Sequence, residues 1–309
     1  MPWEFTNHVE TYAEHAWELL AAHPRENTIA LTVIENARAG QRQSSGPPLF
    51  GWYEGGGTVG AVSLSPPYEL LLAAVPDAGY DDLVTALRAQ DVQLPGVTGD
   101  TATVARFAAA WTTGRPLWPR TTRRLRLYSL GDSLGDSLGD PPGDSPGDEL
   151  GRLRPPSPPP VGRGRLAGNT DLAIAIEWWS AFEQETGLAG VDVATLVRDR
   201  IEDARLWLWE DDTGAVVSLA GRGQTAAGVT RLGPVYTPRV HRRHGYGAAV
   251  TAACTADTLL RDGGHVVLFT DIANPTSNAI YQRLGYRPVR DHATVHFVES
   301  IRQPIPNPG

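Results

Sequence analysis

The chain has 309 residues, a formal net charge of −8 and a single cysteine, Cys254. One cysteine excludes an internal disulfide and a cysteine-based zinc cluster, and we expect it to be a small buried hydrophobic residue. All basic residues are arginine. The lack of lysine excludes P-loop NTPases, kinases and pyridoxal phosphate enzymes, which each depend on one.

The negative charge argues against nucleic acid or an anionic membrane as a partner. The sequence contains no apolar stretch of the roughly 18 residues that span a bilayer, and its N-terminus (MPWEFTNHVE) lacks the pattern of a signal peptide. We therefore expect a cytoplasmic protein with no membrane partner.

Apolar spacing predicts alternating helices and strands in the first part of the chain. Helices are expected over 8–22, 27–38, 80–90 and 101–113, and strands within 49–65, at 68–75 and at 121–130.

Residues 129–160 then read SLGDSLGDSLGDPPGDSPGDELGRLRPPSPPP, with five tetrapeptides that end in Gly-Asp. Such a segment has little to bury, so a disordered linker is predicted. Its aspartates match the spacing of neither an EF-hand nor a nonapeptide calcium repeat.

The same order of elements returns after the linker. Strands are expected at 161–168, 205–210, 215–222, 225–237, 265–270 and 287–297, and helices over 171–186, 193–204, 245–261 and 275–284. Two halves with one ordering indicate an internal duplication. We therefore predict an α/β protein with mixed sheets and two domains, 1–128 and 161–309, joined by the linker 129–160.

The most informative stretch is His241–Val250 (HRRHGYGAAV), which lies between a predicted strand and a predicted helix. A helix N-terminus offers unpaired N–H donors, and Gly245 and Gly247 allow a ligand to approach the backbone. Arg242 and Arg243 add positive charge suited to phosphate oxygens. The sequence has no Asp or Glu from 213 to 256. These features predict a diphosphate site.

A dinucleotide or a metal ion fits this stretch less well. A dinucleotide fingerprint needs a third glycine where Val250 stands, and a metal site on His241 and His244 lacks a third ligand. We therefore expect no metal.

The segment Arg242–Gly247 resembles the R/Q-x-x-G-x-G/A turn of the GCN5-related N-acetyltransferases (GNATs), which holds the pyrophosphate of acetyl-CoA. Residues 270–289 (TDIANPTSNAIYQRLGYRPV) resemble the segment after the fifth strand of that family. The resemblance is clear over 205–297, moderate from 161 and weak before the linker. One departure is that many members have glycine and then arginine where this chain has Arg243 and His244.

The resemblance implies two tandem GNAT-like domains, the first degenerate and the second catalytic, which transfer acetyl from acetyl-CoA to an unidentified amine in a ternary complex. A coenzyme A-binding sensor or scaffold without turnover is the alternative. The residues expected to bind acetyl-CoA are Val235, Tyr236, Thr237, Arg242, Arg243, His244, Gly245, Tyr246, Gly247, Ala248, Asn274, Ser277 and Asn278.

The second motif also has a physical interpretation. Asn274 is a good N-cap, Pro275 a good first helical residue and Gly285 a good terminator. Asn274, Ser277, Asn278 and Tyr281 fall on one face of the intervening helix, at helical spacing. By the resemblance, Tyr281 is the general acid that protonates the leaving sulfur, although a core aromatic would have the same spacing.

The general base is left open. Asp271 follows a predicted strand and could face the cleft, yet it could equally cap the next helix. Glu210, His241 and water are further candidates. The tryptophans Trp178, Trp179, Trp207 and Trp209 are expected in the core.

Overall fold

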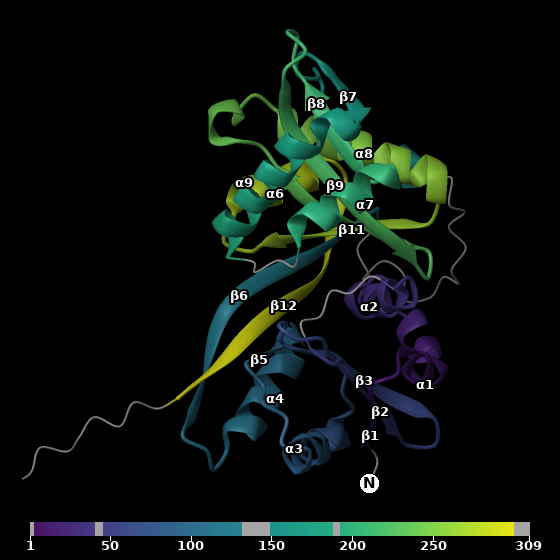
Figure 1. The fold of residues 1–309 in the computed structure, drawn as a ribbon, viewed down its shortest axis with the longest axis vertical. Coiled ribbons are helices and arrows are strands. Elements are labelled where there is room, and N and C mark those ends of the chain that lie inside the picture. The colour runs from purple at the N-terminus through teal and green to yellow at the C-terminus, as the bar shows by residue number, and fades with distance from the viewer. Residues whose placement is uncertain (1–2, 41–45, 132–148, 188–191, 300–309) are drawn as a thin grey trace, which may run out of the picture. The chain divides into compact units, whose positions relative to one another are not determined.

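The computed structural model describes residues 3–40, 46–131, 149–187 and 192–299 (Figure 1). Most of the predicted linker, residues 132–148, lies outside the described residues. Contacts divide the chain into two compact units. The first comprises residues 1–22, 44–124 and 291–309, and the second comprises residues 23–43 and 125–290.

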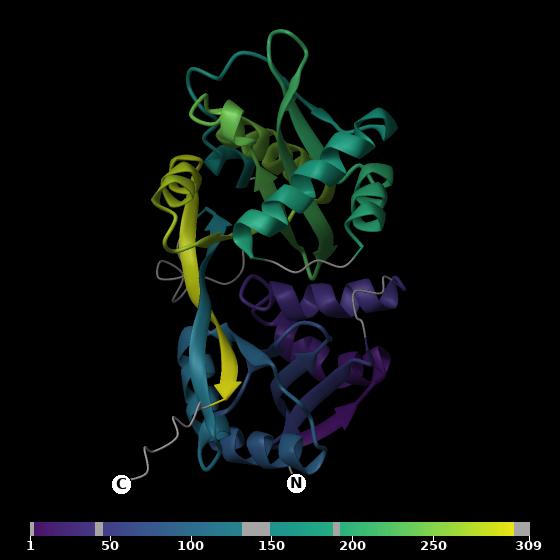
Figure 2. The same cartoon turned by 60° about the vertical axis from the view of Figure 1, so that its left-hand side comes forward.

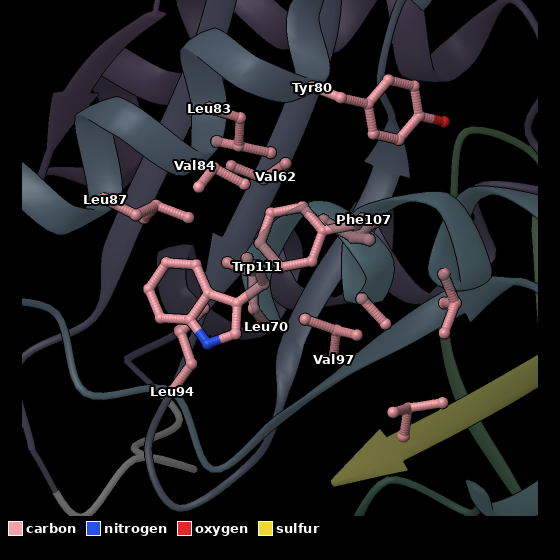
Figure 3. Packing of buried hydrophobic residues seen from close by; sticks show 14 of the residues in the cluster. Val62, Leu70, Tyr80, Leu83, Val84, Leu87, Leu94, Val97, Phe107 and Trp111 are labelled. Carbon is pink, nitrogen blue, oxygen red and sulfur yellow. The ribbon is translucent and has the colours of Figure 1, made fainter. Parts of the chain in front are cut away.

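The first unit is a mixed sheet with helices. Its elements are β1 (Trp3–Thr6), α1 (Val9–Ala21), β2 (Leu49–Glu54), β3 (Thr58–Leu64), β4 (Leu70–Ala74), α3 (Tyr80–Ala89), β5 (Gly96–Asp100) and α4 (Thr101–Thr112). The strand order is β1-β2-β3-β4-β5, and only β4 and β5 pair in parallel. Its core packs Leu83 and Leu87 of α3 and Phe107 and Trp111 of α4 against the strands (Figure 3).

The second unit contains the predicted functional motifs. Its elements are α2 (Thr28–Arg38), β6 (Leu117–Leu130, from residue 125), α5 (Glu149–Arg152), β7 (Arg163–Leu166), α6 (Leu172–Thr186), α7 (Val193–Glu202), β8 (Leu206–Glu210), β9 (Val216–Ala226), β10 (Val229–Tyr236), α8 (Tyr246–Asp262), β11 (His265–Asp271), α9 (Pro275–Arg283) and the start of β12 (Tyr286–Glu299). The strand order is β6-β11-β10-β9-β8-β7. Only β10 and β11 pair in parallel among these registers.

Apolar clusters cover both faces of the second unit's sheet. On one face, Val250 and Cys254 of α8 pack with Leu232 of β10 and Leu268 of β11. On the other, Trp178 and Trp179 of α6 and Ile201 of α7 pack with Leu208 and Leu219, as the crossing of α6 over the strands in Figure 2 illustrates. Cys254 is fully buried, which confirms its predicted place in the core.

Each unit takes a strand from the other half of the sequence. Residues 125–129 of β6 pair with β11 in the second unit, whereas residues 292–296 of β12 pair with β5 in the first. The units are therefore not contiguous halves of the chain. The predicted fold class, a mixed α/β protein, is confirmed by this architecture.

Helices and strands predicted by periodicity appear within a few residues of their expected positions, but β1 and β5 were missed. The β5 sequence GVTGD lacks a strand-like composition because of a backbone constraint. A Cβ on Gly96 would lie 2.3 Å from the Val295 carbonyl oxygen, and Gly99 has φ 152°. Neighbouring backbone thus approaches β5 too closely for larger residues at these two positions.

The two ends of the predicted linker are ordered. Leu130 ends β6 with no exposed surface, and α5 places Glu149 at 2% exposure. Within the described ranges, no helix has the length and apolar character that a bilayer crossing requires.

Candidate functional site

The sheet of the second unit opens between its two parallel strands. The β10–β11 pairing runs from Val229–His265 to Leu232–Leu268, although β10 continues to Tyr236 and β11 to Asp271. Beyond this point Val235 and Tyr236 pair only with β9, opposite Ala220 and Leu219, among the described registers. The last residues of β10, including Val235 and Tyr236, therefore present one edge without a strand partner.

The glycine-rich turn follows directly and leads into α8. The chain passes through a short 3-10 turn at Arg239–His241, and Arg243 and Gly245 then take the left-handed region, with φ of 71° and 84°. The first hydrogen bond of the helix runs from the Ala249 N–H to the Gly245 carbonyl at 3.1 Å. The backbone N–H groups of residues 243–248 donate to no acceptor in the part of the chain that the structure describes. A set of unpaired donors, on residues that are exposed (243–245) or half-buried (246–248), therefore lies at the positive end of a helix of 17 residues.

Gly247 allows α8 to begin close to the end of β10. A Cβ at this position would lie 3.2 Å from the Thr237 hydroxyl oxygen. That hydroxyl in turn lies 2.8 Å from the Ser218 hydroxyl, which donates to the Tyr236 carbonyl at 3.0 Å. The Thr237 side chain therefore fastens the end of β10 to β9, and Gly247 fits against it.

The arginines of the turn differ in their surroundings. The Arg242 guanidinium donates to Glu185 at 2.7 Å and to the Thr237 carbonyl at 2.8 Å, and Arg239 lies 3.5 Å from the same carboxylate. Arg243 is exposed and has no ion-pair partner among the described residues. Although the sequence has no acid from 213 to 256, the turn does have a carboxylate beside it, because α6 brings Glu185 there. Arg243 is the cation that stays open to an anion.

Two aromatic residues of the turn stack on each other. The His244 ring stacks on Tyr246 with a centroid distance of 5.6 Å, and its Nδ1 lies 3.3 Å from the His241 carbonyl oxygen. Tyr236 donates its hydroxyl to Glu185 at 3.3 Å, and burial is the main cause that raises its pKa above the ordinary value. Ala248 is partly buried in the first turn of α8.

The second motif folds as its sequence predicts. The Asn274 side chain caps α9 by accepting from the Ser277 N–H at 3.1 Å, and Pro275 is the first helical residue. Asn278 donates to the carbonyls of Asp271 and Asn274, at 2.8 and 2.7 Å, and accepts from the Tyr128 hydroxyl at 2.9 Å. Both polar groups of Asn278 are thus engaged within the protein, and the Ser277 side chain is half-buried.

Tyr128 was not singled out from the sequence. It is fully buried in β6 and also accepts from the Gln282 side chain at 3.1 Å, so it ties α9 to the strand beside β11. Its position in an alternating strand indicated burial but gave no sign of its partners on a helix about 150 residues away.

Tyr281 lies on the inner face of α9, at the edge of the core beneath α8. Its side chain is 8% exposed and meets Tyr286 edge to face at a ring distance of 6.2 Å. Burial raises the pKa of Tyr281 to about 12. Its hydroxyl has no hydrogen-bond partner among the described residues. The side chain thus packs as a core aromatic while its polar atom stays uncommitted.

The two carboxylates among the predicted bases, Asp271 and Glu210, are engaged in structural contacts. Asp271 accepts from the Ala273 N–H at 2.8 Å, in the turn that precedes α9. Glu210 lies between Arg163 and Arg165, at 3.1 and 2.5 Å, and these arginines, Arg165 first, hold its pKa below the ordinary value. A third carboxylate, Glu183 of α6, was missed by sequence reasoning. Burial raises its pKa, partly offset by a hydrogen bond with Trp179.

The described residues contain no cluster of three or more His, Cys, Asp or Glu side chains that could hold a metal ion. The site is therefore made of backbone donors at the start of α8, an open edge of β10, the exposed cation Arg243 and the hydroxyl of Tyr281.

Comparison with known proteins covers the part of the chain that contains this site. The family model of FR47-like proteins matches residues 209–295, which run from the end of β8 into β12 and contain both motifs. No curated protein matches the sequence at a significant level.

Solved structures match almost the whole chain. An acetyltransferase of the GNAT family from Colwellia psychrerythraea is 12% identical with a TM-score of 0.55, and the match covers 96% of this chain and 100% of that one. A tandem GNAT protein from the clavulanic acid biosynthesis pathway is 15% identical with a TM-score of 0.52, covering 98% and 100%. A GCN5-related N-acetyltransferase from Sphaerobacter thermophilus is 17% identical with a TM-score of 0.56, covering 88% and 87%. The chain therefore has a tandem GNAT fold.

Proposed function

We propose that the protein is an N-acetyltransferase that transfers the acetyl group of acetyl-CoA to an amine. The observation that carries the proposal is the row of unpaired N–H donors over residues 243–248, beside the open edge of β10. Backbone donors at a helix N-terminus suit a diphosphate, and an unpaired strand edge suits the amide groups of a pantetheine arm.

The residues present fit this ligand in two respects. The donors over 243–248 are unpaired within the described chain, those of 243–245 lie on exposed residues, and Arg243 supplies a guanidinium with no competing carboxylate in the described chain. Arg242 supports the site indirectly, because its hydrogen bonds to Glu185 and the Thr237 carbonyl hold the conformation of the turn. The β10 edge at Val235 and Tyr236 would receive the pantetheine arm.

The chemistry requires few groups. When bound, acetyl-CoA supplies a thioester, whose carbonyl carbon the amine nitrogen attacks as the C–S bond breaks and the nitrogen loses its proton. A backbone N–H of the open edge would stabilise negative charge on the carbonyl oxygen. Tyr281 is protonated at neutral pH and would donate its proton to the departing sulfur.

We assign this activity to the second unit, which contains the turn, the open strand edge and Tyr281. The sequence of residues 1–128 has no Arg-x-x-Gly-x-Gly turn. We propose that this part of the chain, the degenerate domain, shapes the acceptor cleft or an interface and binds no second cofactor.

A coenzyme A-binding protein without turnover is the second candidate. It is favoured by the contacts of Asp271 and Glu210, since these two predicted bases are committed to structural roles. Under the transferase proposal, water or His241, the candidates that remain, accepts the proton from the amine.

Thiol release distinguishes the two candidates. The protein is incubated with acetyl-CoA and a panel of amines, and released thiol is measured with a chromogenic disulfide. Cys254 is buried, so it gives no background in the folded protein. Release above the rate without enzyme supports the transferase. Binding of acetyl-CoA without release from any amine supports the binding protein, and absence of binding refutes both.

A further inference from the structure

One carboxylate of the protein already lies against the arginines of the proposed donor site. Glu185, near the end of α6, accepts from the Arg242 Nη2 at 2.7 Å and lies 3.5 Å from the Arg239 Nε. It also accepts from the Tyr236 hydroxyl at 3.3 Å. These three partners belong to the end of β10 or to the turn that follows it. Within the described chain, the Glu185 carboxylate therefore makes polar contacts with the proposed donor site alone.

Glu185 carries the kind of charge that the site is expected to bind. Arg242 is the main cause that lowers the pKa of Glu185, and Arg239 and Tyr236 add to this effect against an opposing contribution of burial. The group is therefore ionised at neutral pH. A carboxylate and a phosphate are alternative anionic acceptors for one guanidinium. Since Glu185 occupies Arg239 and Arg242, it leaves Arg243 as the arginine of the turn that is open to a ligand.

The geometry allows Arg242 to exchange one anion for another. Its Nε donates to the Thr237 carbonyl at 2.8 Å, and only its Nη2 donates to Glu185. The bond to Thr237 can therefore hold the turn after the carboxylate has left. The side chains of Arg242 and Glu185 are 41% and 32% exposed, so both charges reach water when the pair opens. An exposed pair of this kind is weak, and its exchange for a phosphate contact costs little.

We propose that Glu185 competes with the diphosphate of the donor for Arg239 and Arg242, and thereby weakens the binding of acetyl-CoA and of the product coenzyme A alike. This inference rests on the proposed acetyltransferase function, and it concerns the regulation of the same site. As the diphosphate reaches the backbone donors, its oxygens take the guanidinium N–H groups and the carboxylate turns to solvent. Because acetyl-CoA and coenzyme A share the diphosphate, the contact weakens both by the same factor and favours release of the product. Glu185 acts through the arginines and is a positioning residue.

The direction of a single effect tests the proposal. Glu185→Gln removes the charge but keeps an oxygen that can accept from Arg242 and Tyr236. Calorimetry should show that this variant binds coenzyme A about three- to tenfold more tightly than the wild type does. Glu177→Gln removes the same charge from an exposed position of α6, where the side chain has no polar partner in the described chain, and should leave the affinity unchanged. If Glu185 were needed to shape the turn for its ligand, its replacement would weaken binding; weaker or equal binding overturns the proposal.

Two comparisons locate the effect at the arginines. Inorganic pyrophosphate should raise the melting temperature of Glu185→Gln more than that of the wild type, whereas S-acetylpantetheine, which has no phosphate, should affect the two proteins equally. In an Arg242→Met background, Glu185→Gln should improve coenzyme A binding by about twofold or less, because the principal donor that it releases is missing. The full improvement in that background would show that Glu185 does not compete for Arg242, and would overturn the proposal.

Turnover separates this inference from the proposed function. In the thiol-release assay, Glu185→Gln should lower KM for acetyl-CoA by about the factor found for coenzyme A binding, without raising kcat, because the gain is the same in the ground and transition states. Tighter coenzyme A binding by Glu185→Gln without thiol release from any amine refutes the transferase alone. Thiol release with unchanged KM and unchanged coenzyme A affinity refutes the competition alone. Absence of coenzyme A binding in both proteins overturns both.

Discussion

Two tyrosines that meet edge to face provide the sharpest test of the site, because the same substitution should have opposite effects at each. Tyr281→Phe removes a hydroxyl with no partner among the described residues, so the free energy of unfolding should change by less than about 0.5 kcal/mol. Tyr286→Phe breaks a 2.7 Å hydrogen bond with Thr255 in a fully buried setting. This loss should cost about 1–3 kcal/mol.

The effects on rate should be reversed. Loss of a general acid at Tyr281 should lower kcat by about 10²–10⁴ with little change in KM for acetyl-CoA. The pKa of about 12 keeps Tyr281 protonated at neutral pH, so the defect should not depend on pH between 6 and about 10. Tyr286→Phe should keep the wild-type kcat at a temperature where it remains folded.

Urea unfolding gives the free energy of unfolding of each variant, and thiol release gives the kcat of each. Wild-type turnover in Tyr281→Phe would contradict the role of general acid, and a large loss of stability in that variant would contradict the absence of a partner for its hydroxyl.

Three further outcomes follow from individual contacts. Cys254 is fully buried and burial raises the pKa of its thiol to about 12, so it should react with a disulfide reagent only after unfolding; rapid reaction of the native protein would contradict this burial. The Arg165 guanidinium is the main cause that holds the pKa of Asp171 below its ordinary value of 3.8. Ionised Asp171 therefore stabilises the fold fully above pH 3.8, and this contribution is lost as the pH falls through the lowered pKa. Asp171→Ala should therefore cost about 3 kcal/mol at pH 7 in urea unfolding, and a cost that persists unchanged at pH 2 would exclude this origin. Arg243→Asn tolerates the left-handed backbone but lacks the charge, so calorimetry should show about tenfold weaker acetyl-CoA binding with unchanged stability, and equal affinity would remove Arg243 from the site.

Local signals allowed much of the fold to be predicted. Asn274, Pro275 and the glycines around α8 are caps and turn residues whose effect depends on a few neighbours in sequence, and the structure uses Asn274 and Pro275 as predicted. Most helices and strands follow from apolar spacing for the same reason. β5 was not predicted, because its glycines are required by the close approach of neighbouring strands. The exchange of β6 and β12 was not predicted either, because it depends on pairings between distant segments.

The electrostatics of the site were less accessible to sequence reasoning. Glu185, which pairs with Arg242, lies on a helix 57 residues earlier in the sequence. No residue near the glycine-rich turn in sequence indicates this contact. Partners of charged groups are set by tertiary packing, so spacing along the chain predicts them poorly.

The central claim is that the donors at the start of α8 bind the diphosphate of a coenzyme A thioester. The direct measurement is the stabilisation of the protein by acetyl-CoA compared with S-acetylpantetheine, which carries the same thioester but no diphosphate. Acetyl-CoA at a hundredfold its dissociation constant should raise the free energy of unfolding by about 2.7 kcal/mol, and S-acetylpantetheine at the same concentration should have little effect. Equal stabilisation by the two ligands, or none by acetyl-CoA, would contradict the account.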